Sequence, residues 1–113
     1  MITNDYIRNK LRIISWKSKG YSATTVLDLS LGHEHFGGGI RIIPSHPQQN
    51  TSELAVKLAK KMSLKSKYIN LPFSGAKTVI TRTHHQEENR SLCISYSILA
   101  YSNRVCTVFY HVV

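Results

Sequence analysis

The chain has 113 residues, 42% of them apolar, with neither the roughly 18 consecutive apolar residues of a membrane span nor a basic-then-apolar signal sequence. This size suits one domain with its own core, and two cysteines without metal-ligand spacing indicate reduced thiols in the cytoplasm. Fifteen lysines and arginines against six acidic residues give a net charge of +9, which would attract polyanions such as nucleic acid.

The first part of the chain predicts strands. Residues 11–16 are apolar and β-prone, residues 17–20 suit a turn, and residues 21–31 alternate well enough to return as the partner strand. Residues 32–39 have the composition of a loop, and residues 40–43 form a third short apolar run. We expect these three strands to be consecutive neighbours in one sheet.

A helix is predicted next. Asn50 can cap it, with Glu53 three residues further on, and the helix should end near Lys65. An apolar stripe at helical spacing would face the core: Leu54, Ala55, Leu58, Ala59 and Met62. The densest basic group of the chain lies on or just after this helix: Lys57, Lys60, Lys61, Lys65 and Lys67. No aromatic residues are interleaved there as a stacking platform would require, so a solvated helix face is favoured over a nucleic-acid interface.

Secondary structure is less clearly predicted for the rest of the chain, residues 77–113. Residues 77–81 form an apolar strand, and residues 84–90 a polar connection. Residues 92–101 are core as either helix or strand, and residues 106–113 are β-branched and aromatic, which predicts a last strand. We therefore expect an α/β fold: a mixed β-sheet sandwich of four or five strands with two or more flanking helices.

Two lysines stand out because they flank a turn and a segment of small residues. Lys65 and Lys77 lie twelve residues apart, with Leu71-Pro72 and the predicted bend Ser74-Gly75-Ala76 between them. Small side chains let a ligand approach the backbone closely. Two ammonium groups in one cleft lower each other's pKa, and partial desolvation lowers it further. One lysine can thus hold a carboxylate while the other serves as a neutral base.

Three motifs around these lysines occur in a characteristic order. They are Gly37-Gly38-Gly39-Ile40-Arg41-Ile42-Ile43-Pro44, then Met62-Ser63-Leu64-Lys65, then Asn70-Leu71-Pro72-Phe73-Ser74-Gly75-Ala76-Lys77. Over residues 12–80 the chain resembles the N-terminal domain of the glutamate/leucine/phenylalanine/valine dehydrogenase family. The resemblance implies one domain over residues 1–113, of the α/β type that carries substrate residues and subunit contacts in that family.

The resemblance implies a role for each matching residue. Lys65 would bind the α-carboxylate of an L-amino acid, Lys77 would act as the catalytic proton-transfer lysine, and Gly38 and Gly39 would let the strand approach the substrate. Glutamate dehydrogenases have a lysine just before the glycine pair, where this chain has Gly37. An apolar amino acid is therefore favoured over glutamate.

Other positions depart from the family pattern. Ser74 replaces a usual glycine, and Thr78 stands where glycine or alanine is common, so either could crowd the substrate loop. From Thr83 onward the chain has no aspartate to supply the family's catalytic carboxylate. Complete family enzymes use NAD or NADP, but this sequence contains no Gly-x-Gly-x-x-Gly. We expect the chain to bind no cofactor itself and to be inactive alone.

The histidines and cysteines give weaker signals for a site. His33 and His35 lie two apart and could start a zinc site, but no further ligands follow at a recognisable spacing, so we expect exposed loop histidines and no metal. Cys93 has no motif that would pair it with a histidine as a nucleophile.

Three hypotheses follow for function. The first is a truncated or divergent NAD(P)-dependent L-amino-acid dehydrogenase, reduced to its substrate and subunit-contact domain and expected to form homo-oligomers. The second is a non-enzymatic module that binds an amino acid or pairs with a full-length dehydrogenase. The third and weaker alternative is a basic nucleic-acid-binding domain, whose affinity would fall steeply with salt.

Overall fold

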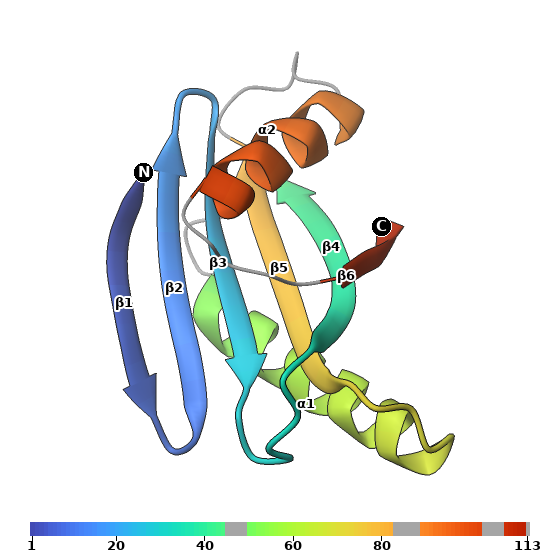
Figure 1. The fold of residues 1–113 in the computed structure, drawn as a ribbon. Helices are drawn as coiled ribbons and strands as arrows, with labels where there is room; N and C mark the ends of the chain where they lie inside the picture. The colour runs from blue at the N-terminus through green and yellow to red at the C-terminus, as the bar shows by residue number, and fades with distance from the viewer. Residues whose placement is uncertain (45–49, 83–88, 103–107, 113) are drawn as a thin grey trace.

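A single mixed sheet organises the chain, and a helix lies on each of its faces (Figure 1). The computed structural model describes residues 1–44, 50–82, 89–102 and 108–112. Within these ranges the strands are β1 (Ile2–Arg8), β2 (Leu11–Ser18), β3 (Tyr21–Asp28), β4 (Phe36–Pro44), β5 (Ser74–Arg82) and β6 (Val108–Val112), and the helices are α1 (Thr51–Tyr68) and α2 (Asn89–Ser102). The six strands lie in the order β1-β2-β3-β5-β4-β6.

Strand direction changes in the middle of the sheet. The pairs β1/β2, β2/β3 and β3/β5 are antiparallel, whereas β5/β4 and β4/β6 are parallel. The expectation that the first three predicted strands are consecutive neighbours is wrong at its last step, because β5 lies between β3 and β4. The helix α1 provides the crossover that parallel neighbours need, and it returns the chain beside β4.

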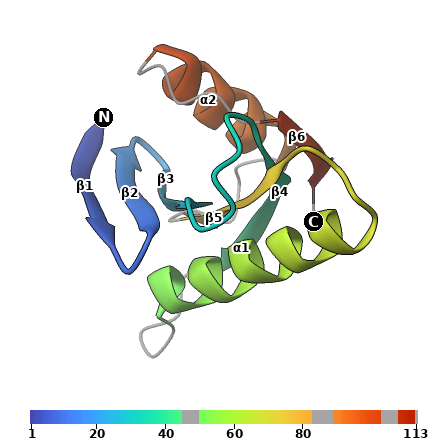
Figure 2. The same ribbon diagram turned by 60° about the horizontal axis from the view of Figure 1, so that its bottom comes forward.

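The helices cover opposite faces of the sheet, as Figure 2 shows. One apolar cluster, on the α1 face, contains Leu11, Ile13, Val26, Ala55, Ala59 and Val79. The other, on the α2 face, includes Ile14, Trp16, Tyr21, Leu27, Ile40, Ile80, Leu92 and Tyr96. Alternate residues of each strand point to opposite faces, so both sides of the central strands are buried.

The predicted helix start is confirmed, because the Asn50 side chain accepts a hydrogen bond from the Glu53 amide at 3.1 Å. The helix runs on to Tyr68, beyond the predicted end at Lys65. Its buried positions are Ala55, Ala59, Ser63 and Ser66, whereas the neighbouring Leu54, Leu58 and Met62 are half-buried. The small buried residues let α1 pack close to the sheet.

The segment 92–101 is a helix, within α2. Leu92, Tyr96 and Ala100 are buried at a spacing of four residues, as expected for one face of a helix. Neither helix in the described ranges has the length and apolar character required to cross a membrane.

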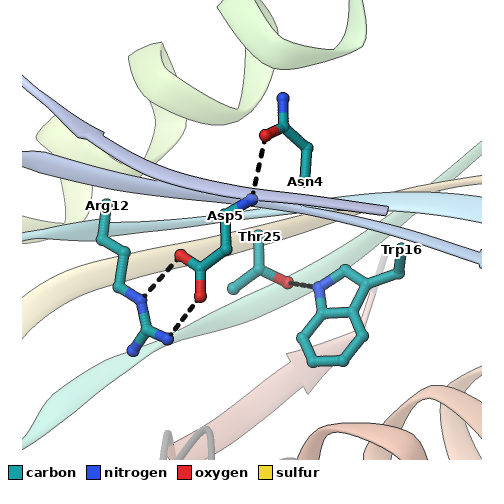
Figure 3. A network of polar contacts seen from close by, with 5 residues as sticks. All are labelled: Asn4, Asp5, Arg12, Trp16 and Thr25. Carbon is teal, nitrogen blue, oxygen red and sulfur yellow. Dashed lines mark hydrogen bonds and ion pairs between the residues drawn. The ribbon is translucent and has the colours of Figure 1, made fainter. Parts of the chain in front are cut away.

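The strand β1 was not predicted. It forms one edge of the sheet, and all its residues but Ile2 are exposed. An ion pair joins it to β2: the Arg12 guanidinium donates to both carboxylate oxygens of Asp5, at 3.0 and 2.8 Å (Figure 3). The Arg12 hydrogen bond lowers the pKa of Asp5 and outweighs a small opposing effect of burial.

A buried polar network joins the central strands to α2. Figure 3 shows the Trp16 indole N–H donating to the Thr25 hydroxyl at 2.9 Å. Thr25 also shares hydrogen bonds with the Thr78 and Tyr96 hydroxyls, and Thr78 donates to Tyr96 at 3.0 Å. The rings of Trp16 and Tyr96 meet edge to face, with centroids 5.6 Å apart. Thr25 is thus the centre of the network.

We expect Thr25→Val to lower the free energy of unfolding by about 2 kcal/mol or more, because it leaves buried donors unsatisfied at nearly constant volume. Thr24→Val is the matched control. Thr24 lies on the same strand opposite Val79, on the α1 face. Urea unfolding of both variants measures the difference, and equal losses would contradict the central role of Thr25.

Candidate functional site

Lys77 lies in the middle of the sheet. It stands on β5, opposite Val26 of β3 on one side and Gly39 of β4 on the other. It shares the α1 face of the sheet with Val79, two residues further along. The residue is only 6% exposed, which is uncommon for lysine because burial of an ammonium group is costly. A buried lysine in the middle of a sheet is therefore a candidate functional residue.

Two further cations act on Lys77. Burial is the largest cause of a lowered Lys77 pKa, and the positive charges of Arg41 and then Lys65 lower it further. Arg41 stands on β4, two residues after Gly39, so it faces the same side of the sheet as Lys77. Lys65 comes from the last turn of α1. The expected lowering of the Lys77 pKa is confirmed, with burial as its main cause.

Arg41 is a member of this group that we did not single out from the sequence. Its spacing from Gly39 was a usable signal, because residues two apart on a strand share a face. The structure thus brings Arg41, Lys65 and Lys77 within electrostatic reach of one another. Such a group favours an anion between its members and eases loss of the Lys77 proton.

The glycine-rich segments lie within strands, contrary to the predicted loop over 32–39 and the predicted bend at 74–76. A Cβ atom on Gly38 would lie 1.6 Å from the Ala76 carbonyl oxygen on the next strand. A Cβ on Gly75 would lie 2.1 Å from the Ala59 carbonyl oxygen of α1. These glycines therefore allow close packing of backbone on backbone.

Gly75 is also held by a hydrogen bond. Its amide donates to the Ser63 hydroxyl at 2.8 Å, in a buried contact between β5 and α1. Ser63 lies two residues before Lys65, and Gly75 two residues before Lys77. The contact therefore fixes the helix and the strand that carry the two predicted site lysines.

The two departures from the family pattern do not both crowd Lys77. The Thr78 hydroxyl bonds to Thr25 and Tyr96 on the α2 face, so its side chain points away from Lys77. Ser74 is fully buried at the start of β5. Its amide donates to the His35 carbonyl oxygen at 2.9 Å, and its hydroxyl has no hydrogen-bond partner among the described residues.

Metal and thiol chemistry find little support in the described ranges. His33 and His35 are exposed, and no group of three or more potential metal ligands forms among the described residues. Burial raises the pKa of the Cys93 thiol, which disfavours the reactive thiolate. His84, His85, Glu87, Glu88 and Cys106 lie outside the described residues.

The glycine triplet does not suit a dinucleotide. Gly37, Gly38 and Gly39 lie within β4, which pairs with β5 on one edge and β6 on the other. A pyrophosphate is normally held by free amide groups at a turn that opens a helix. The described residues therefore offer no site for a nicotinamide cofactor at this triplet.

Comparisons with known proteins add one finding. No family model matches the sequence, and no curated protein matches it. Among solved structures, L-tryptophan dehydrogenase from Nostoc punctiforme is similar, with a TM-score of 0.64 over 92% of this chain and 20% sequence identity. The likeness is one of fold. The chain spans 31% of the length of that protein, so its α/β fold is similar to a part of that enzyme.

Proposed function

We propose that this chain is the amino-acid-binding domain of an NAD(P)-dependent L-amino-acid dehydrogenase. The observation that carries the proposal is the buried Lys77, which is surrounded by the charges of Arg41 and Lys65. A group of three cations, one of them buried, suits an anionic group such as an α-carboxylate. The similarity in fold to an amino-acid dehydrogenase supports the same assignment.

In this proposal Lys65 binds the α-carboxylate and Lys77 moves the protons. Lys65 is exposed at the end of α1 and can reach a ligand at modest desolvation cost. Lys77 has a lowered pKa, so it can give up its proton more readily than an exposed lysine and then accept one from the substrate ammonium group. Gly39, the Cα partner of Lys77 on β4, adds no side chain to this face of the sheet.

The proposed substrate is an apolar L-amino acid. Gly37 lies on the same face of β4 as Gly39, and it offers no cation for a second carboxylate. The similar solved enzyme is named for tryptophan, which is also apolar.

The complete reaction needs a nicotinamide. NAD or NADP would accept a hydride from the amino acid, and a nicotinamide-binding domain would have to supply that cofactor. We propose that the domain acts within a larger assembly, as a homo-oligomer or beside a full-length dehydrogenase. Alone it binds the amino acid and does not oxidise it.

Thermal melts with L-leucine, L-valine, L-phenylalanine, L-tryptophan and L-glutamate test this proposal. We expect an apolar amino acid to raise the melting temperature, since a ligand at one hundred times its Kd stabilises the fold by about 2.7 kcal/mol. Lys65→Met and Lys77→Met should each reduce the shift, and Lys61→Met, at an exposed position of the same helix, should leave it unchanged. A shift of undiminished size in both site variants would contradict the assignment.

One observation favours the second candidate, a module that pairs with another protein. Ile94, Ile98 and Tyr101 are 51%, 63% and 84% exposed along one side of α2. Pairing through this stripe with a dehydrogenase subunit would bury it. Sedimentation of the chain together with a full-length amino-acid dehydrogenase tests this candidate: pairing through the stripe predicts co-sedimentation that Ile98→Ser abolishes, and no co-sedimentation would contradict it.

A further inference from the structure

A cavity lies on the α1 face near the end of β3. It encloses about 340 Å³, a volume within the range of small-molecule sites. Its apolar wall includes Leu11, Leu31 and Leu64, and its charged groups are Asp28, Lys60 and Lys67. Neither Lys65 nor Lys77 lines it. It is therefore separate from the site described above.

Asp28 is the unusual group in this cavity, because it is a carboxylate that is only 5% exposed. Its Oδ1 accepts a hydrogen bond from the Ser30 amide at 3.0 Å. Burial alone would raise the pKa of Asp28, but hydrogen bonds from Ser30 and Ser63 and the charge of Lys60 lower it overall. The carboxylate is therefore ionised at neutral pH.

Among the described residues, no lysine, arginine or histidine nitrogen lies within 4 Å of the Asp28 carboxylate. The ion pair within that distance in the described ranges joins Asp5 to Arg12 instead. A buried carboxylate normally has a closely paired cation, because the charge is costly to desolvate. Asp28 instead borders an open cavity. An ammonium group on a ligand would supply the missing partner.

The lysines and leucines that line the cavity restrict the kind of ligand that it can bind. Lys60 and Lys67 would repel a simple amine but would attract a carboxylate on the same molecule. The three leucines provide an apolar wall for a side chain. We propose that this cavity is a second ligand site, which takes an α-amino acid with an apolar side chain, its ammonium on Asp28 and its carboxylate at Lys60 and Lys67.

Ser63 connects this cavity to the strand of Lys77. Its hydroxyl hydrogen-bonds to Asp28 and accepts from the Gly75 amide. The cavity thus shares a structural contact with the proposed catalytic strand. The second site does not depend on catalysis, however, and it stands even if Lys77 has no substrate.

Amide NMR spectra recorded during titration with L-leucine test the proposal. We expect saturable shifts of the amides of Asn9, Ser30 and Leu31 around the cavity. 3-Methylbutylamine, which lacks the carboxylate, and 4-methylpentanoate, which lacks the ammonium, should each bind at least tenfold more weakly there. Absence of saturable shifts with L-leucine, or an amine that binds as tightly as L-leucine, would overturn the assignment.

Three variants make the test specific. Asp28→Asn keeps the acceptor for the Ser30 amide but removes the charge, and Lys67→Glu reverses a charge on an exposed residue; each should weaken the cavity shifts at least tenfold. Lys61→Glu, at an exposed lysine of α1 that does not line the cavity, is the control and should leave them unchanged. Unchanged affinity in Lys67→Glu would overturn the proposal even if Asp28→Asn fails to fold.

Lys77→Met separates this proposal from the proposed function. We expect it to leave the cavity shifts intact while it abolishes any shifts around Gly39. Loss of the cavity shifts in Lys77→Met would show that leucine occupies one site only, and would contradict a second one.

Discussion

Gly38→Ala should prevent stable folding. The new Cβ would lie 1.6 Å from the carbonyl oxygen and 2.5 Å from the carbonyl carbon of Ala76, which are backbone atoms of the adjacent strand and cannot turn aside. Overpacking of a protein interior typically lowers the free energy of unfolding by about 1–3 kcal/mol. A clash with backbone atoms that cannot move should cost more, so we expect the free energy of unfolding to fall by more than about 3 kcal/mol. Urea unfolding or a thermal melt measures it.

Gly32→Ala is the matched control. Gly32 has a φ of +74° but no atom within 4 Å of an added Cβ, so the substitution costs only the strain of a left-handed backbone, about 1 kcal/mol. We expect a cooperative transition with a modestly lower midpoint. A Gly38→Ala protein as stable as Gly32→Ala would show that β4 and β5 do not approach as closely as described.

Lys77→Met should stabilise the domain while it abolishes amino-acid binding at the Lys65/Lys77 site. Methionine is of similar length and removes a buried charge that lies near Arg41 and Lys65. We expect a melting temperature about 5 °C higher at pH 7, roughly the effect of 1 kcal/mol in a domain of this size. Opposite changes in stability and binding are typical of a residue kept for function.

This stabilisation should depend on pH in a definite direction. The pKa of Lys77 is lower in the folded chain than its ordinary value of 10.5, so between the two values the unfolded state holds more protons and stability rises with pH. Below the lowered pKa both states are protonated and the full cost remains. Melts from pH 7 to 10.5 should show the advantage of Lys77→Met shrinking as pH rises, and a constant or growing difference would contradict the burial of a charged Lys77.

Much of the fold could be predicted from the sequence where the local signals were strong. The capping residue Asn50 and the periodic small and apolar residues predicted α1, and the apolar runs predicted β2, β3 and β5 to within a few residues. Residues 92–101 remained ambiguous between helix and strand, because a short apolar run fits either period. The structure shows that this segment is a helix, with Leu92, Tyr96 and Ala100 buried along one side of it.

The strand β1 could not be predicted from hydrophobic alternation, because as an edge strand it is exposed almost throughout. The signal that was available lay in the turn after it. Asn9 and Lys10 both have positive φ, at 52° and 62°, as the two-residue hairpin turn requires. Asparagine is common at positive φ and so hints at such a turn, but lysine is not and gives no such signal in the sequence.

Strand order also lay beyond the sequence. The glycine triplet had the composition of a loop, and only the register of Gly38 with Ala76 shows that the missing side chains serve strand packing. For the site, the sequence indicated Lys65 and Lys77 but not Arg41 or Asp28, because their importance depends on which face of the sheet they share. Facing and burial are tertiary properties.

The most direct test of the central claim is the titration of Lys77 itself, followed by NMR of its labelled side-chain ε-carbon with and without saturating L-leucine. We predict a pKa below 10.5 in the free chain and a changed pKa with leucine bound, because the ligand places its charged groups near the Lys77 ammonium. A Lys77 pKa at or above 10.5 that leucine does not change would contradict the account of this residue as a buried proton carrier in an amino-acid site.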